Sequence, residues 1–171
     1  MKKLFLTLIM LCGFALFSSA NLQAQDRLAY VNSADLLTNM PEYKSAEKQL
    51  EDYTKQKEAQ IKQRYEALQQ AAGELQRRVE GLTITQQEVQ TEQQRLVQEE
   101  QAIQQIAVNA EMEIAKKQQE LLTPIQERAM TVIKAVADEL GYNYVIDAST
   151  GVLLSYPPGG DITEQVKARL M

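Results

Sequence analysis

The stretch Gly81-Leu82-Thr83-Ile84-Thr85-Gln86-Gln87-Glu88 decides the fold, because it interrupts a long run of residues with a helical composition. Gly81 stands where a helix ends, in the position that tolerates a left-handed backbone. Thr85 and Glu88 form a capping box, which is the signature of a new helix start. Because helices joined by so short a loop lie antiparallel, the stretch predicts a helical hairpin.

The residues before this turn predict a long coiled-coil helix that begins at Pro41, where a missing N–H has no consequence. Its apolar positions alternate steps of four and three residues, as in a heptad seam. An earlier seam, from Tyr43 to Tyr53, runs in a shifted frame, and the two frames join through a stutter near Lys57. The predicted seam residues of the second frame are Ile61, Tyr65, Leu68, Leu75 and Val79.

The residues after the turn predict a returning helix whose seam is thinner. Gln93 and Glu100 occupy seam positions and weaken it. The seam residues that we expect to hold the hairpin together are Leu96, Ile103 and Ile114.

The loop length also predicts the register of the hairpin. If residue 80 faces residue 86, the numbers of facing residues add up to about 166. Pro124 then falls where the returning helix passes the base of the outgoing one, near Pro41. We therefore expect a kink at Pro124. Beyond it the apolar face widens, as in a helix that packs into a globular core.

Segments on both sides of the hairpin predict a few short strands. Residues 27–32 are rich in apolar residues and β-formers. Residues 142–147 and 152–156 have the same character, and a turn over residues 148–151 joins them into a β-hairpin.

Two short helices are expected beside these strands. The first spans residues 33–39, capped by Asn32 or Ser33. Asp161 and Glu164 form a capping box that opens the second helix near the end of the chain.

These elements predict an α+β fold that is mostly α. Residues 25–40 and 124–171 form a small β-containing body, and residues 41–123 form an antiparallel coiled-coil arm. A core this small rarely supplies more than ~3–5 kcal/mol without a disulfide, a metal or a partner, and sheet edges need cover. We therefore expect an oligomerisation body, built from Leu28, Tyr30, Val31, Tyr144, Val145, Ile146, Val152, Leu154, Ile162 and Val166.

The first 24 residues have the features of a signal peptide. Lys2 and Lys3 precede an apolar run over residues 4–17, which is too short to span a membrane. Cleavage is expected after Ala24 or Ala20. Removing the two lysines leaves 16 of the 18 basic residues against 23 acidic ones, a formal charge of about −7 for the exported chain.

Composition argues against several classes of function. The chain has no His and a single Cys, which lies in the leader, so proton transfer at neutral pH and metal binding lack their usual side chains. An acidic chain is unsuited to nucleic acid, which requires clustered Lys and Arg. We expect no enzyme activity, no catalytic, cofactor-binding or metal site, and no nucleic-acid partner.

Several motifs in this order resemble the Skp/OmpH family of periplasmic chaperones for outer-membrane proteins. They are the opening strand 28–32, the long charged hairpin, the strand Gly141-Tyr142-Asn143-Tyr144-Val145-Ile146-Asp147 and the closing segment 161–166. The resemblance spans nearly the whole exported chain.

The resemblance implies a jellyfish-shaped homotrimer in the periplasm. Three arms would enclose unfolded outer-membrane proteins without ATP, with transient contact to a membrane surface. Family members are basic at the arm tips, whereas this chain is acidic, so capture by positive charge is not carried over. The residues expected to contact the client at the tip are Arg77, Arg78, Leu82 and Ile84.

An alternative function remains open at this stage. A structural coiled coil or envelope tether without chaperone activity would have the same overall pattern. Such a protein should have continuous, strongly apolar seams on both helices, whereas Gln93 and Glu100 interrupt the returning one.

Overall fold

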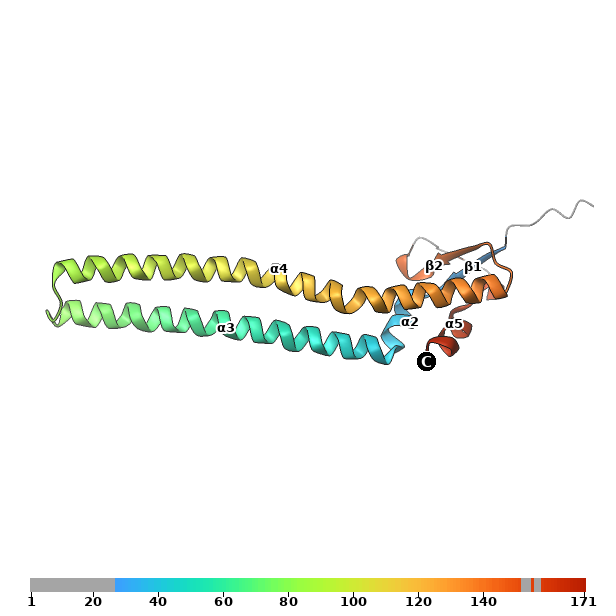
Figure 1. The fold of residues 1–171 in the computed structure, drawn as a ribbon, viewed down its shortest axis with the longest axis horizontal. Helices are drawn as coiled ribbons and strands as arrows, with labels where there is room; N and C mark the ends of the chain where they lie inside the picture. Colours follow the sequence, from blue (N-terminus) through green and yellow to red (C-terminus); the bar gives the residue numbers. More distant parts are fainter. Residues whose placement is uncertain (1–26, 152–154, 156–157) are drawn as a thin grey trace, which may run out of the picture.

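The computed structural model describes residues 27–151, Ser155 and residues 158–171. Two long antiparallel helices, α3 (Pro41–Glu80) and α4 (Gln86–Glu139), form an arm that projects from a small body (Figure 1). The 40 residues of α3 correspond to about 60 Å of helix at 1.5 Å per residue. The predicted fold class, mostly α with a small sheet, is confirmed. The predicted signal peptide lies outside the described residues.

The turn between the long helices confirms the predicted capping box and corrects the backbone at Gly81. The Thr85 side chain accepts a hydrogen bond from the N–H of Glu88, and the Glu88 carboxylate accepts one from the N–H of Thr85 at 2.8 Å. Gly81 has a φ of −78°, so it is not left-handed. The left-handed residue is Leu82, with a φ of 52°. A leucine in this region is strained because its Cβ crowds the following carbonyl.

Helix α4 continues through Pro124 without a break. The helix spans 54 residues with the proline inside it. In place of the expected kink at Pro124, Figure 1 shows only a gentle bend in the amber part of α4. As a result the arm and the body share one helix. Among the described residues, no helix is both long and apolar enough to cross a membrane.

The body contains a two-stranded parallel sheet. β1 (Leu28–Val31) pairs with β2 (Tyr144–Asp147), and Leu28 lies opposite Tyr144 in the register. Parallel strands need a long crossover connection, and here the connection is the arm itself. The prediction that the first strand shares a sheet with the segment after the long helix is confirmed. Of the predicted second hairpin strand, residues 152–154 and 156 lie outside the described residues.

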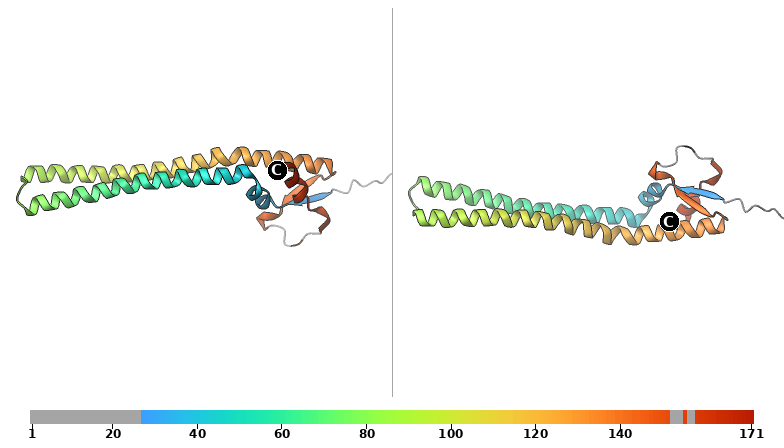
Figure 2. Two further views of the ribbon diagram at one scale, coloured as in Figure 1. Left: turned by 90° about the horizontal axis from the view of Figure 1, so that it is seen from below. Right: turned by 90° about the horizontal axis from the view of Figure 1, so that it is seen from above.

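Helix α2 (Ser33–Asn39) and helix α5 (Thr163–Leu170) pack beside the sheet (Figure 2). Asn32 caps α2 by accepting from the N–H of Asp35. The predicted capping box of the last helix is wrong, because Ile162 occupies the N-cap position and provides no side-chain hydrogen bond. The Asp161 carboxylate instead accepts a hydrogen bond from the N–H of Thr163 at 2.9 Å. The helix therefore begins at Thr163, one residue later than the predicted capping box requires.

A small apolar core joins these elements. Val31, Leu36, Met40, Val136 and Val166 are buried in it, which places side chains from β1, α2, α4 and α5 in mutual contact. The widened apolar face predicted beyond Pro124 is confirmed, since Ala129, Val136 and Ala137 are buried. The core is small for a stable domain.

A short 3₁₀ segment, η2 (Pro158–Gly160), lies against β1. A Cβ atom at Gly160 would lie 3.1 Å from the carbonyl oxygen of Leu28 and 3.1 Å from Cε1 of Tyr30, so any larger residue would require these neighbours to move by a few tenths of an ångström. Tyr30 forms an isolated bridge with Asp161 and is only 2% exposed. β1 is therefore flanked on both edges.

Candidate functional site: the helical arm and the sheet surface

The arm seam is closed in its middle and opens toward the tip. Ile103 is fully buried, and Ala46 and Ala110 are nearly so. The predicted seam residues Ile61, Leu68, Leu75, Leu96 and Ile114 are half-buried. Tyr65 and Val79, also predicted for the seam, are exposed, because two helices bury only the stripe where they touch and leave its flanks in solvent.

Polar contacts across the arm confirm the predicted register. The hydroxyl of Tyr53 donates to Glu113 at 3.1 Å, and Lys57 forms an ion pair with the same carboxylate. Arg64 lies 3.5 Å from Glu99. The residue numbers of these pairs add up to between 163 and 170, around the expected 166. Hydrogen bonds from Lys57 and then Tyr53 lower the pKa of Glu113, and the same contact raises the pKa of Lys57.

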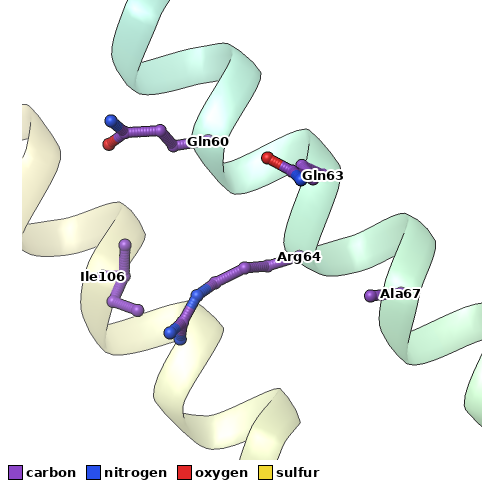
Figure 3. Close-up of a pocket in the computed structure, with 5 residues that line it drawn as sticks. All are labelled: Gln60, Gln63, Arg64, Ala67 and Ile106. Carbon is purple, nitrogen blue, oxygen red and sulfur yellow. The ribbon is translucent and has the colours of Figure 1, made fainter.

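A groove lies beside the seam, a little beyond the predicted stutter near Lys57. It has a volume of about 520 Å³ and lies between Gln60, Gln63, Arg64 and Ala67 of α3 and Ile106 of α4. Figure 3 shows Arg64 reaching from α3 toward α4, with Ile106 on the facing helix. Polar side chains of α3 therefore line this groove, while the buried Ile103 keeps the seam closed nearby.

The four residues expected to contact the client at the tip differ in exposure. Leu82 is 91% exposed, and Arg77 is also exposed. Arg78 and Ile84 are half-buried. Both arginines lie in the last turn of α3, where their positive charge interacts favourably with the negative end of the helix dipole. Leu82 is thus the most accessible apolar side chain of the turn.

The residues predicted for the oligomerisation body divide into two groups. Tyr30, Val31, Ile162 and Val166 are buried within the single chain. Leu28 and Tyr144 are 46% and 56% exposed and are paired neighbours on the sheet, while Val145 and Ile146 are half-buried. Val152 and Leu154 lie outside the described residues. Leu28 and Tyr144 are therefore the predicted residues with the most surface left for another copy.

Comparison with known proteins identifies the family. The family model described as "Outer membrane protein (OmpH-like)" matches residues 27–170. The chain belongs to this OmpH-like family.

Relatives of this OmpH-like chain carry the name "Chaperone protein Skp". The chain is 28% identical to the one from Pectobacterium atrosepticum over 157 residues, covering 91% of this chain and 94% of the relative. It is 30% identical to the one from Photorhabdus luminescens over 142 residues, covering 80% of this chain and 82% of the relative.

A solved structure has the same fold. It is described as a candidate outer membrane chaperone (OmpH-like) from Caulobacter crescentus CB15, and it superposes with a TM-score of 0.73 at 20% sequence identity. The similarity covers 86% of this chain and 85% of that one. The predicted membership of the Skp/OmpH family is confirmed by the family match and the named relatives.

Sequence reasoning missed a polar cluster that anchors β2 to α2 in this OmpH-like body. The Asp147 carboxylate accepts hydrogen bonds from the N–H and hydroxyl of Ser33, and from the N–H and hydroxyl of Ser149 at 2.9 and 2.7 Å. Burial alone would raise the pKa of Asp147, but the four hydrogen bonds together lower it. An Asp directly after a strand and two residues before a Ser is the local signal for such a turn.

Sequence reasoning also missed the exposed apolar residues on α4. Val97, Val108 and Met112 are each more than half exposed, although all three lie in the middle of the arm. The signal was available in the spacing of uncharged residues on the side of α4 away from its seam. Within the described residues, no three His, Cys, Asp or Glu side chains are grouped so that they could hold a metal ion.

Proposed function

We propose that this OmpH-like chain is a periplasmic holdase chaperone. It binds unfolded outer-membrane proteins between its helical arms, without ATP, and prevents their aggregation before they insert into the membrane. The chaperone role agrees with the Skp relatives, which match most of both chains. The periplasmic location agrees with the signal peptide expected over residues 1–24.

The arm is the observation that carries the proposal. An outer-membrane protein exposes alternating apolar strands before insertion and would aggregate in water. A holdase needs many weak contacts spread over a large surface. The 40-residue helix α3 and its partner α4 supply a long surface whose seam is partly open and whose tip exposes Leu82.

The proposed chaperone also requires self-association of the body. The described core is small, and Leu28 and Tyr144 form an exposed apolar pair on the sheet. Covering this pair with other copies would add buried area that the single chain lacks. Following the family resemblance, we propose a homotrimer with the arms enclosing a shared space, with residues 25–40 and 124–171 as its body and residues 41–123 as its arm.

The tether alternative is less well supported by the arm. A purely structural coiled coil gains nothing from a polar groove beside its seam, whereas Arg64, Gln60 and Gln63 line one here. Such an arm also has no need of apolar side chains that face solvent, as Val97 and Val108 do.

The test removes the distal arm in register. Deleting residues 60–105 and closing the gap with a short Gly-Ser loop removes facing parts of α3 and α4. The shortened chain should keep the oligomeric mass of the full chain in static light scattering. It should also fail to protect a urea-denatured outer-membrane barrel protein from aggregation on dilution into nucleotide-free buffer, whereas the full chain protects it. Full protection by the shortened chain would refute the role of the arm.

A further inference from the structure

An uncharged stripe runs along the exposed side of α4. Its members recur with the spacing of one helix face, in steps of four, three, four, seven and four residues. All are exposed, and the three apolar members are more than half exposed. We call the following six residues the neutral stripe: Gln90, Gln94, Val97, Gln101, Val108 and Met112.

Charged residues of the same helix segment lie elsewhere. Residues 86–120 contain three basic and seven acidic residues, and none belongs to the neutral stripe. Glu99 and Glu113 face the other helix, where they pair with residues of α3. Val97 lies six residues before the buried Ile103, which places the two about 120° apart around the helix. The neutral stripe is thus separate from both the seam and its ion pairs.

The exposed side of α3 over residues 51–66 has a different character. Glu51 pairs with Lys55 there, and Lys62 lies 3.8 Å from Glu66. All four side chains are more than half exposed. This part of α3 therefore exposes charged pairs, whereas the neutral stripe of α4 exposes none, and this contrast argues against a merely solvated face on both helices.

Two hollows lie along the neutral side of α4. The distal one has a volume of about 430 Å³ and includes Gln90, Gln94, Val97 and Gln101 in its lining. Toward the body the uncharged run continues through the exposed Ala115 and Gln119. It ends at a second hollow of about 270 Å³, which α4 shares with Leu36 and Leu37 of α2 and which Met130 and Ile133 help to line.

We propose that the neutral stripe binds an extended segment of non-native polypeptide by contacts that do not depend on charge. A glutamine amide offers both a donor and an acceptor, so it pairs with the free main-chain N–H and C=O groups of an unfolded chain. Val97, Val108 and Met112 contact the apolar side chains that alternate along such a segment. On a chain with a formal charge of −5, an uncharged face also admits acidic clients that charged faces would repel. This inference rests on the holdase function proposed above.

The test compares a variant with two carboxylates added to the neutral stripe and a control variant with two carboxylates added to α3. The stripe variant is Val97→Glu/Val108→Glu. The matched control is Ala59→Glu/Gln70→Glu, at exposed positions of α3. Binding of a fluorescently labelled, urea-denatured outer-membrane barrel polypeptide is measured by anisotropy at low and high salt, and circular dichroism checks that all three proteins have the same helix content.

The stripe variant should bind about tenfold more weakly than the parent, because its new carboxylates lose water without gaining a partner. The control should change by less than about twofold, and the affinity of the parent should change little with salt. Equal binding by the two variants, or strong salt dependence of the parent, overturns the stripe and leaves the holdase function standing.

Two further outcomes also overturn the inference. A lower solution mass for the stripe variant alone would show that another copy of this chain covers the stripe. A parent protein that binds no denatured barrel polypeptide at all would remove the holdase function itself.

Discussion

The guanidinium of Arg27 donates a hydrogen bond to the carbonyl oxygen of Leu140, with 3.0 Å between Nη1 and the oxygen. The same guanidinium lies 4.7 Å from the centre of the Tyr142 ring. Gly141, with a φ of 72°, ends α4 between them, and a Cβ there would lie 3.3 Å from Nη1. One arginine thus ties the start of β1 to the end of the helix that forms the returning arm.

Replacing Arg27 should loosen this junction. We expect Arg27→Ala to lower the free energy of unfolding by about 1–2 kcal/mol, through loss of the hydrogen bond and of the cation–π contact. Urea denaturation at fixed protein concentration measures the change. Arg95→Ala is the control, because Arg95 forms an exposed ion pair with Glu92 one turn away on the arm, and it should cost less than about 0.5 kcal/mol. Equal losses would show that the junction contributes no more to stability than an exposed ion pair does.

Asp147 should stabilise the fold at neutral pH, and acid should remove this contribution. The pKa of this carboxyl is lowered in the folded chain by hydrogen bonds from Ser33 and Ser149, against the effect of burial. A folded pKa below the unfolded one stabilises the fold above the unfolded value, near 3.8, and this contribution disappears as the pH falls through the folded pKa. Asp147→Asn should therefore be less stable than the parent at pH 7, and the gap should narrow below pH ~4. A gap that is constant down to pH ~3 would contradict the assignment.

Ile103 should be the main apolar anchor of the arm. It is fully buried, whereas Val97 on the same helix is 52% exposed. We expect Ile103→Ala to cost about 2–4 kcal/mol and Val97→Ala less than about 0.5 kcal/mol. Thermal unfolding followed by circular dichroism compares the two. Similar losses would mean that the seam does not close at Ile103.

Leu82 allows backbone strain to be separated from side-chain contact. Leu82→Ala and Leu82→Gly both remove the exposed side chain, but only glycine relieves the positive φ of 52°. The glycine variant should be more stable than the alanine variant by about 1 kcal/mol, while both weaken client binding equally. The opposite order of stability would show that the turn adopts another backbone conformation in solution.

The hairpin could be predicted from sequence because local signals specify it. The capping box of Thr85 and Glu88 forms at the position that the sequence predicts. The loop length predicts which residues of the two helices face each other, and the hydrogen bond between Tyr53 and Glu113 agrees with that register. These features depend on residues a few positions apart or on simple geometry. Residue preference predicts a left-handed backbone at Gly81. The structure has it at Leu82, because hydrogen bonds from the N–H groups of Leu82 and Thr83 back to α3 close the turn, and residue preference does not reveal them.

The body was harder to predict because its contacts span the whole chain. Local sequence predicts a capping box of Asp161 and Glu164, yet the bridge between Tyr30 and Asp161 holds this segment against β1. Likewise, the pairing of Ser33 with Asp147 joins residues more than a hundred positions apart. The exposed side of α4 is hard to predict for a different reason. Its apolar residues are few and lie among glutamines, so the sequence there resembles an ordinary solvated helix face.

The most direct test of the central claim asks which part of the chain touches an unfolded client. A photoreactive residue placed at position 82 or 97 samples the arm, and one placed at the exposed position 165 of α5 samples the body. After illumination with a denatured outer-membrane barrel polypeptide, crosslinks should form from positions 82 and 97 and not from position 165. Crosslinks from the body alone, with none from either arm position, would contradict the account.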